Sequence, residues 1–171
     1  MTMEEKAPLG GMPIARAPEW TNPLVGMFAL MAATYKAYGP ESLPILSEGM
    51  KHLGRRTGED MLAHELVPKD CTPTEWGRFT HQLMDLTGMY VYKEIIATDT
   101  VYEFTVPAEV WPYHRPVEYL GAPEQSCDIS ADWDRGCLET VSPRIVMTQP
   151  ECAGRGDAVC RWRYELVPSN D

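Results

Sequence analysis

The chain has 171 residues, enough for one domain with a substantial core, because a domain of this size buries roughly 70% of the surface that its unfolded chain exposes. Its 15 Lys and Arg residues against 25 Asp and Glu residues give a formal net charge of −10, which repels phosphate backbones and argues against nucleic-acid binding. The longest apolar run, residues 23–33, falls short of the ~20 residues of a membrane span, so we predict a cytoplasmic protein without a membrane segment.

The first helix is predicted to follow a flexible arm. Residues 1–19 contain three prolines and no sustained periodicity, so we interpret them as the arm and residues 20–171 as a single domain. Thr21 or Asn22 can cap a helix with Pro23 in its first turn, and Gly39-Pro40 ends it. Residues 24–33 are apolar on nearly every side, which predicts a helix buried in the core or covered by a second subunit. We therefore expect a homodimer formed through this helix.

Two further helices are predicted before residue 88. Leucine and methionine recur at helical spacing over residues 43–53, while Gly54 and Gly58 leave the continuation toward Leu66 open. The next helix begins with the capping box Thr72-Pro73-Thr74-Glu75 and ends at Gly88. Its apolar face carries Trp76, Phe79, Leu83 and Leu86.

After Gly88 the pattern changes from helical to alternating. Residues 90–97 and 101–106 predict a hairpin with Asp99-Thr100 at the turn, and residues 145–149 and 160–166 predict two more strands. Residues 107–134 are interpreted as irregular and helical connections. The fold class is therefore α+β, with N-terminal helices packed on an antiparallel sheet of about four strands.

Two segments resemble a known family. The helical stretch 37–58 is similar to the N-terminal helices of the L-2-amino-thiazoline-4-carboxylic acid hydrolase-like family. Pro112, the segment 118–124, Cys127 and the ending Gly156-Asp157-Ala158-Val159-Cys160 resemble its C-terminal pattern. The resemblance implies a hydrolase that acts on a C–N or C–S bond of a small amino-acid-derived heterocycle. Trp111-Pro112 stands where the family often has Cys-Pro, so no role of that thiol is transferred.

The same ending is also similar to 4-vinyl-reductase-type domains, which sense small molecules without turnover. Some of these hold zinc with an early Cys, a Glu and a Cys pair separated by seven residues. Cys127, Cys152 and Cys160 match three of these positions, whereas Gln149 stands where the Glu would be and Glu151 is shifted. The alternative is that these thiols are reduced, buried core residues without a metal.

The candidate site residues follow from these two hypotheses. For a hydrolase, Cys127 is the candidate nucleophile, His114 the preferred base and His81 a weaker one, because His81 stands one position off the apolar helix face. Arg144 or Arg155 would bind a substrate carboxylate. Asp157 is interpreted as a turn residue. The aromatic residues expected to build the core or the pocket wall are Trp133, Trp162, Tyr90 and Tyr164.

Overall fold

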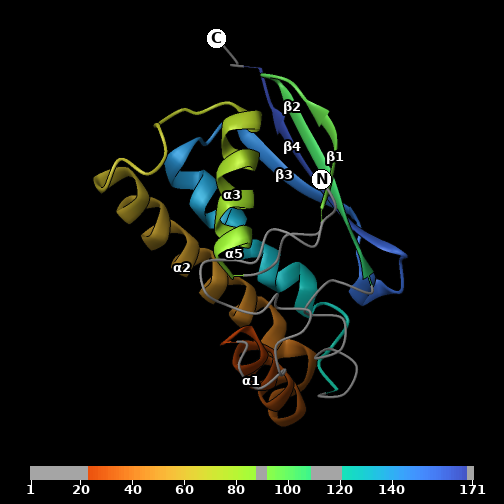
Figure 1. Ribbon diagram of the computed structural model, residues 1–171. Helices are drawn as coiled ribbons and strands as arrows, with labels where there is room; N and C mark the ends of the chain where they lie inside the picture. The colour runs from red at the N-terminus through yellow and green to blue at the C-terminus, as the bar shows by residue number, and fades with distance from the viewer. Residues whose placement is uncertain (1–22, 88–91, 109–120, 169–171) are drawn as a thin grey trace.

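The computed structural model describes residues 23–87, 92–108 and 121–168, so the predicted arm over residues 1–19, Tyr90 and His114 lie outside the described residues. Figure 1 shows the described chain as helices gathered on one side of a single sheet. The elements in order are α1 (Pro23–Tyr38), η2 (Gly39–Ser42), α2 (Leu43–Ala63), α3 (Pro73–Thr87), β1 (Lys93–Ala97), β2 (Val101–Pro107), α5 (Ser126–Val141), β3 (Ile145–Glu151), η4 (Ala153–Arg155) and β4 (Val159–Leu166).

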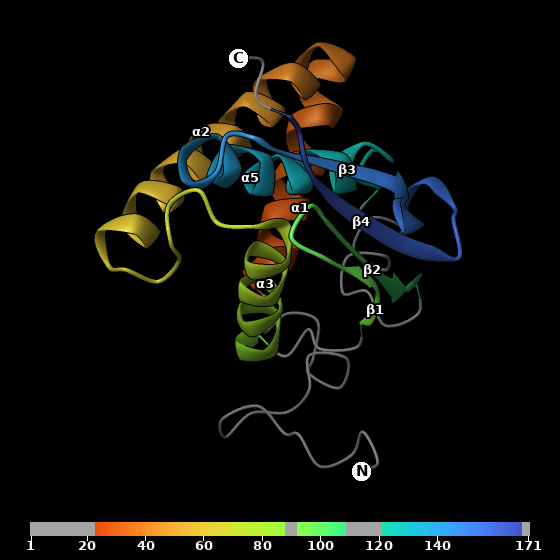
Figure 2. The same cartoon turned by 90° about the horizontal axis from the view of Figure 1, so that it is seen from above.

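The four strands form one antiparallel sheet in the order β1-β2-β4-β3. The predicted α+β class and both predicted strand pairs are therefore confirmed. Helices α3 and α5 lie against one face of this sheet, which we call the inner face, and α2 packs behind α5 (Figures 1 and 2).

Buried and more exposed residues alternate along the central strand β4, and the buried ones form the inner face. In β4, Cys160, Trp162 and Tyr164 are buried while the residues between them are more exposed, as the sequence predicts. In β2 the opposite face, which carries Glu103, is buried as well. Arg161 and Arg163 cover it, because each donates to the Glu103 carboxylate, at 2.7 and 3.0 Å.

Helix α5 (Ser126–Val141) was not predicted as a defined helix, because the sequence indicated only irregular and helical connections over residues 107–134. It runs through Asp132, Asp134 and Gly136, residues that are uncommon in helix interiors and that obscure the apolar period, yet all three are buried. It crosses α2 at two glycines, one on each helix. A Cβ on Gly54 of α2 would lie 2.1 Å from the Trp133 carbonyl oxygen. A Cβ on Gly136 of α5 would lie 2.1 Å from the Lys51 carbonyl oxygen. Helix α2 continues through Gly54. The glycine is needed at this position because the backbones of α2 and α5 meet there.

The first helix ends and the third begins as predicted, whereas the candidate caps Thr21 and Asn22 and the predicted stop at Gly88 lie outside the described residues. Thr72 and Glu75 form the capping box, in which the Glu75 carboxylate accepts from the Thr72 amide at 2.7 Å and the Glu75 amide donates to the Thr72 hydroxyl at 3.2 Å. In α1, Phe28 is buried but Leu30 is 66% exposed, so only one side of this helix packs on the domain. The homodimer through α1 stays a prediction. No helix within the described ranges is both long and apolar enough to cross a membrane.

Candidate functional site

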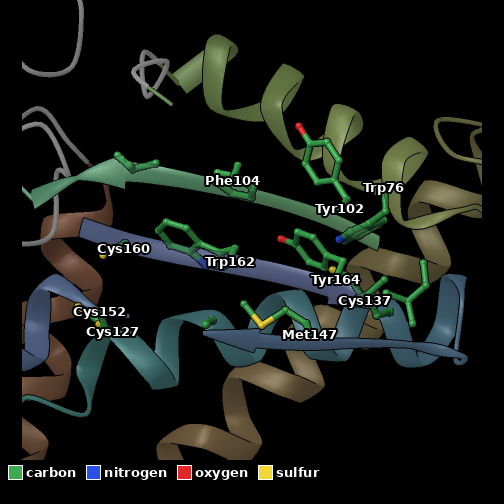
Figure 3. Packing of buried hydrophobic residues seen from close by; sticks show 14 of the residues in the cluster. Trp76, Tyr102, Phe104, Cys127, Cys137, Met147, Cys152, Cys160, Trp162 and Tyr164 are labelled. Carbon is green, nitrogen blue, oxygen red and sulfur yellow. The ribbon is translucent and has the colours of Figure 1, made fainter. Parts of the chain in front are cut away.

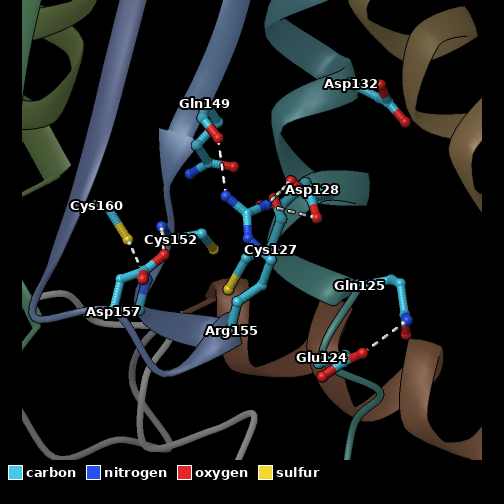
Figure 4. Close-up of polar contacts among 12 residues, drawn as sticks. Glu124, Gln125, Cys127, Asp128, Asp132, Gln149, Cys152, Arg155, Asp157 and Cys160 are labelled. Atoms are coloured by element: carbon cyan, nitrogen blue, oxygen red, sulfur yellow. Dashed lines mark hydrogen bonds and ion pairs between the residues drawn. The ribbon is translucent and has the colours of Figure 1, made fainter.

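Three of the cysteines meet at one end of the inner face. Cys127 comes from the first turn of α5, Cys152 follows β3, and Cys160 lies in β4 beside it; all three are buried (Figures 3 and 4). The Ala153 amide donates to the Cys160 sulfur at 3.2 Å. Gly154 is required here, because a Cβ on it would lie 2.6 Å from the Cys127 sulfur. These are the three cysteines that the resemblance to 4-vinyl-reductase-type domains singled out as possible zinc ligands, and zinc binding by them stays a prediction.

Negative charge in this thiol cluster belongs on Cys152. Hydrogen bonds from the Cys127 and Cys160 thiols lower the pKa of Cys152, and the Gly154 amide and the Arg155 charge add to the effect. The same hydrogen bonds, together with burial, raise the pKa of Cys127 and of Cys160. The raised pKa of Cys127 favours its protonated form. A protonated thiol is a poor nucleophile, so Cys152 has more thiolate character than the residue that the sequence favoured.

Polar side chains from three elements surround the thiol cluster. Arg155 donates to both oxygens of Asp128, at 2.7 and 2.9 Å, and to the Gln149 backbone carbonyl at 2.8 Å (Figure 4). The guanidinium predicted to bind a substrate carboxylate thus already binds a carboxylate of its own chain. Asp157 accepts from the Cys152 amide at 2.7 Å, which agrees with its predicted turn role.

The thiol cluster contains donor atoms of the types that zinc binds. Three thiols are present, and the buried Gln149 Oε1 has no hydrogen-bond partner in the described chain, so a fourth, neutral oxygen donor is available. Among the described residues, however, no group of three or more His, Cys, Asp or Glu side chains is arranged to hold a metal ion. Zinc binding therefore stays a prediction.

A second buried polar group, His81, lies on the same inner face. The His81 ring is 4% exposed, stacks on Tyr92 with centroids 3.5 Å apart, and meets the Phe104 ring edge-on at 4.5 Å. Its Nδ1 lies 3.0 Å from the Tyr102 hydroxyl. Its Nε2 is buried and has no hydrogen-bond partner in the part of the chain that the structure describes. We call His81, Tyr92, Tyr102 and Phe104 the histidine cluster.

His81 is neutral in this setting, because burial lowers its pKa from 6.5 to about 4. A neutral imidazole has one nitrogen that donates and one that accepts. A buried nitrogen without a partner is rare in folded proteins, which makes His81 Nε2 a candidate position for binding a small molecule.

The sequence analysis placed His81 one position off the apolar helix face, and this was wrong. Gly77, one turn earlier in α3, brings the helix directly onto the sheet, since a Cβ on it would lie 2.0 Å from the Tyr102 ring. This close approach turns His81 toward the sheet and buries it. The spacing of Gly77 and His81 is the sequence feature that could have predicted this burial, because residues four apart lie on one face of a helix.

The two clusters are joined by stacked aromatic residues. The Phe104 and Trp162 rings stack with centroids 5.1 Å apart and planes 8° from parallel. In Figure 3 this pair lies between the thiol cluster at one end of the face and Tyr102 at the other. Trp162 and Tyr164 are thus core residues, as predicted.

The remaining predicted site residues lie elsewhere. Trp133 is half-buried between α5 and α2, where its Nε1 donates to the Thr57 hydroxyl at 3.3 Å. Arg144 is exposed just before β3. The structure therefore brings together Cys127, Cys152, Cys160 and Arg155, but places Trp133 on the helix–helix contact.

These features define a class of fold: helices on one face of a four-stranded antiparallel sheet, with buried polar groups on that face. The chain is similar to the crystal structure of the phenol-responsive sensory domain of the transcription activator PoxR with phenol, with a TM-score of 0.59, 16% identity, and coverage of 83% of this chain and 73% of that one. At this identity the likeness shows the fold alone.

A second solved structure is a trafficking protein particle complex subunit 3 from Naegleria fowleri covalently bound to palmitic acid. It aligns with a TM-score of 0.48 and 15% identity, over 88% of this chain and 95% of that one. No family model matches the sequence, and no curated protein matches it.

Proposed function

We propose that this protein is a small-molecule-binding module of the sensory type, and that its ligand binds at the histidine cluster. One observation carries the proposal: the buried His81 Nε2 has no hydrogen-bond partner among the described residues, although aromatic rings surround it. Leaving such a nitrogen unsatisfied costs about 1–3 kcal/mol, which a ligand would recover.

The surroundings favour a small aromatic ligand with one polar group. Tyr92 and Phe104 supply ring faces and edges that suit another planar ring. A single neutral nitrogen would orient the ligand, as the few polar groups of apolar binding sites usually do. The phenol-responsive domain that shares the fold supports this choice, and phenol is the natural first probe.

The proposal is tested by titrating phenol into the protein and into His81→Phe. Phenylalanine keeps a ring in the aromatic cluster but removes both nitrogens, so we expect phenol affinity to fall by about tenfold or more, in line with the loss of one buried hydrogen bond. Calorimetry measures the affinity, and the thermal shift caused by ligand confirms it independently.

The matched control is His52→Phe, on the exposed side of α2. It should leave phenol binding unchanged. Equal phenol binding by the His81→Phe variant and the parent protein would contradict the assignment of this site. Failure of the parent to bind phenol, aniline or indole at millimolar concentration would contradict the proposed function.

We also propose that the thiol cluster binds zinc, through Cys127, Cys152 and Cys160. The support is that three buried thiols lie together, and that Gln149 Oε1, on the adjoining strand β3, is buried and has no hydrogen-bond partner in the described chain. Thiolate ligands are those that zinc prefers in structural sites. The ion would hold α5, β3 and β4 together at the end of the inner face opposite Tyr102.

Under this proposal, protein purified without chelators carries about one zinc ion per chain, and Cys160→Ser loses the metal and several degrees of thermal stability, because metal binding and folding are coupled. Elemental analysis and thermal denaturation measure the two effects. Cys71→Ser, at a buried cysteine outside the cluster, is the control that keeps its zinc. A zinc content near zero in the parent would reject the metal and leave a purely hydrogen-bonded thiol cluster.

Hydrolysis of a small heterocycle stays a prediction from the sequence. His114, its preferred base, lies outside the described residues, and the raised pKa of the buried Cys127 thiol works against nucleophilic attack. The geometry supports binding better than turnover.

A further inference from the structure

The single proton on the His81 ring decides which kind of ligand group the histidine cluster can recognise. In a neutral imidazole, Nε2 donates when Nδ1 is bare and accepts when Nδ1 holds the proton. Nε2 is the buried nitrogen without a partner among the described residues, and Nδ1 lies 3.0 Å from the Tyr102 hydroxyl. The direction of the hydrogen bond between Tyr102 and Nδ1 therefore determines the class of ligand. This inference rests on the proposed function, because it concerns the same site.

The Tyr102 side chain is held in place against His81. The residue is fully buried in β2, where it pairs with Ala97 of β1 and Tyr164 of β4. Gly77 brings α3 directly against its ring, since a Cβ on Gly77 would lie 2.0 Å from a ring carbon. The hydrogen bond that the structure gives its hydroxyl within the described part of the chain is the one to His81 Nδ1. The packing of α3 on the sheet thus fixes both the position of this hydroxyl and its partner.

The two possible directions of this hydrogen bond leave different groups unsatisfied. If Nδ1–H donates to Tyr102, the phenolic proton and the Nε2 lone pair are both buried without a partner in the described chain. If Tyr102 donates to Nδ1, Nε2–H alone remains unsatisfied. Each such group destabilises the folded state, so the second direction is favoured. A phenolic O–H is also the better donor and an imidazole nitrogen the better acceptor, in line with their pKa values of about 10 and 6.5 in model peptides.

We infer that Tyr102 fixes His81 as the Nε2–H tautomer, so that the site selects aromatic ligands with a hydrogen-bond acceptor, such as the oxygen of an aryl aldehyde or of a phenol. A ring whose polar group can only donate, such as indole, would place a second proton against Nε2–H and leave both donors unsatisfied. Tyr102 is a positioning residue here, because it acts on the ligand through His81.

The first test needs no ligand. Long-range ¹H–¹⁵N spectra of the histidine side chains report which ring nitrogen carries the proton and whether the other nitrogen accepts a hydrogen bond. We expect His81 to be protonated on Nε2 in the parent protein. In Tyr102→Phe, which removes only the hydroxyl, the Nδ1 signal should move downfield, toward that of a nitrogen without a hydrogen bond. A purely structural role of Tyr102 in the core would not produce this change.

The matched control is Tyr38→Phe, the same substitution at a tyrosine that is 74% exposed. It should leave both nitrogen signals of His81 in place. Protonation of Nδ1 in the parent, or an unchanged Nδ1 signal in Tyr102→Phe, overturns the inference. Because the parent spectrum decides the tautomer by itself, the test does not depend on the stability of the Tyr102 variant.

The second test compares two pairs of probes with matched shapes. Benzaldehyde differs from styrene by an acceptor oxygen, and indole differs from indene by a donor N–H. The ratio of benzaldehyde affinity to styrene affinity should be at least about tenfold higher in the parent than in His81→Phe, in line with one buried hydrogen bond. The ratio of indole affinity to indene affinity should not be higher in the parent. Comparing the two proteins cancels the different solvation of the probes.

The outcomes separate this inference from the proposed function. A gain for indole in the parent without a gain for benzaldehyde overturns the inference and leaves the proposed function intact, because Nε2 then accepts. If neither ratio differs between the parent and His81→Phe, both fail, since His81 then contacts no polar group of the ligand. If no probe binds, phenol included, the proposed function fails, whereas the spectra still decide the tautomer.

Discussion

Replacing Gly136 by alanine is expected to lower the free energy of unfolding by about 3 kcal/mol or more, the upper range for an overpacked interior. The added Cβ would lie 2.1 Å from the carbonyl oxygen of Lys51 and 2.9 Å from its Cα. Both atoms belong to the α2 backbone, which cannot rotate away as a side chain can. Helices α2 and α5 would have to separate, and the contacts along their whole length would loosen.

The reciprocal change, Gly54→Ala, is expected to have a similar effect, because its Cβ would meet the Trp133 carbonyl oxygen at 2.1 Å. Urea denaturation measures the loss for both variants. Gly49→Ala is the matched control, since it lies in the same helix and a Cβ there meets no described atom within 4 Å. It should stabilise the protein by about 0.5–1 kcal/mol, the usual gain from replacing glycine in a helix. Similar stabilities for the Gly136 and Gly49 variants would contradict the close crossing.

The second large effect concerns the buried carboxyl of Asp134 and the pH dependence of stability. Asp134 accepts from the Tyr164 hydroxyl at 2.6 Å and from Trp76 Nε1 at 3.1 Å. Burial nevertheless outweighs these bonds and raises its pKa from 3.8 to about 6. Between pH 4 and 6 the folded state therefore binds more protons at this group than the unfolded state does. Its contribution to stability is highest near pH 4 and is lost as the pH rises through 6, by roughly 3 kcal/mol.

His81 has the opposite dependence. Its pKa falls from 6.5 in the unfolded chain to about 4 when folded, so between these values the unfolded state binds the extra proton. Its contribution is present above pH 6.5 and is lost as the pH falls toward 4, again by roughly 3 kcal/mol. In the parent protein the two groups largely offset each other between pH 4 and 6.

Single substitutions should separate the two contributions. Relative to the parent, Asp134→Asn is expected to lose stability as the pH falls from 6.5 to 4, because only the His81 contribution remains. His81→Phe is expected to gain stability over the same range. Urea denaturation at several pH values measures both slopes, with Glu59→Gln, an exposed helix residue, as the control. Parallel pH profiles for all four proteins would contradict the assignment.

Local signals in the sequence determined much of the fold. The capping box at Thr72 and Glu75 and the alternation of Cys160, Trp162 and Tyr164 depend on residues a few positions apart, so each could be recognised without knowledge of the rest of the chain. The resemblance to 4-vinyl-reductase-type domains suggested that Cys152 and Cys160 act together, and the pairing of β3 with β4 brings the two residues to the same end of the sheet.

Other features were decided only by the tertiary structure. Helix α5 has no clear apolar period of its own, and it is stable as a buried helix because Gly136 and Gly54 let it pack closely on α2 while Asp134 finds donors in Trp76 and Tyr164. His81 looked peripheral in the sequence. Its burial, its neutral state and its unpartnered nitrogen depend on the contact of Gly77 with Tyr102, two residues that meet only when α3 packs on the sheet. The sequence therefore determined the elements that local periodicity and capping can specify, whereas the binding site depends on long-range contacts that no local pattern records.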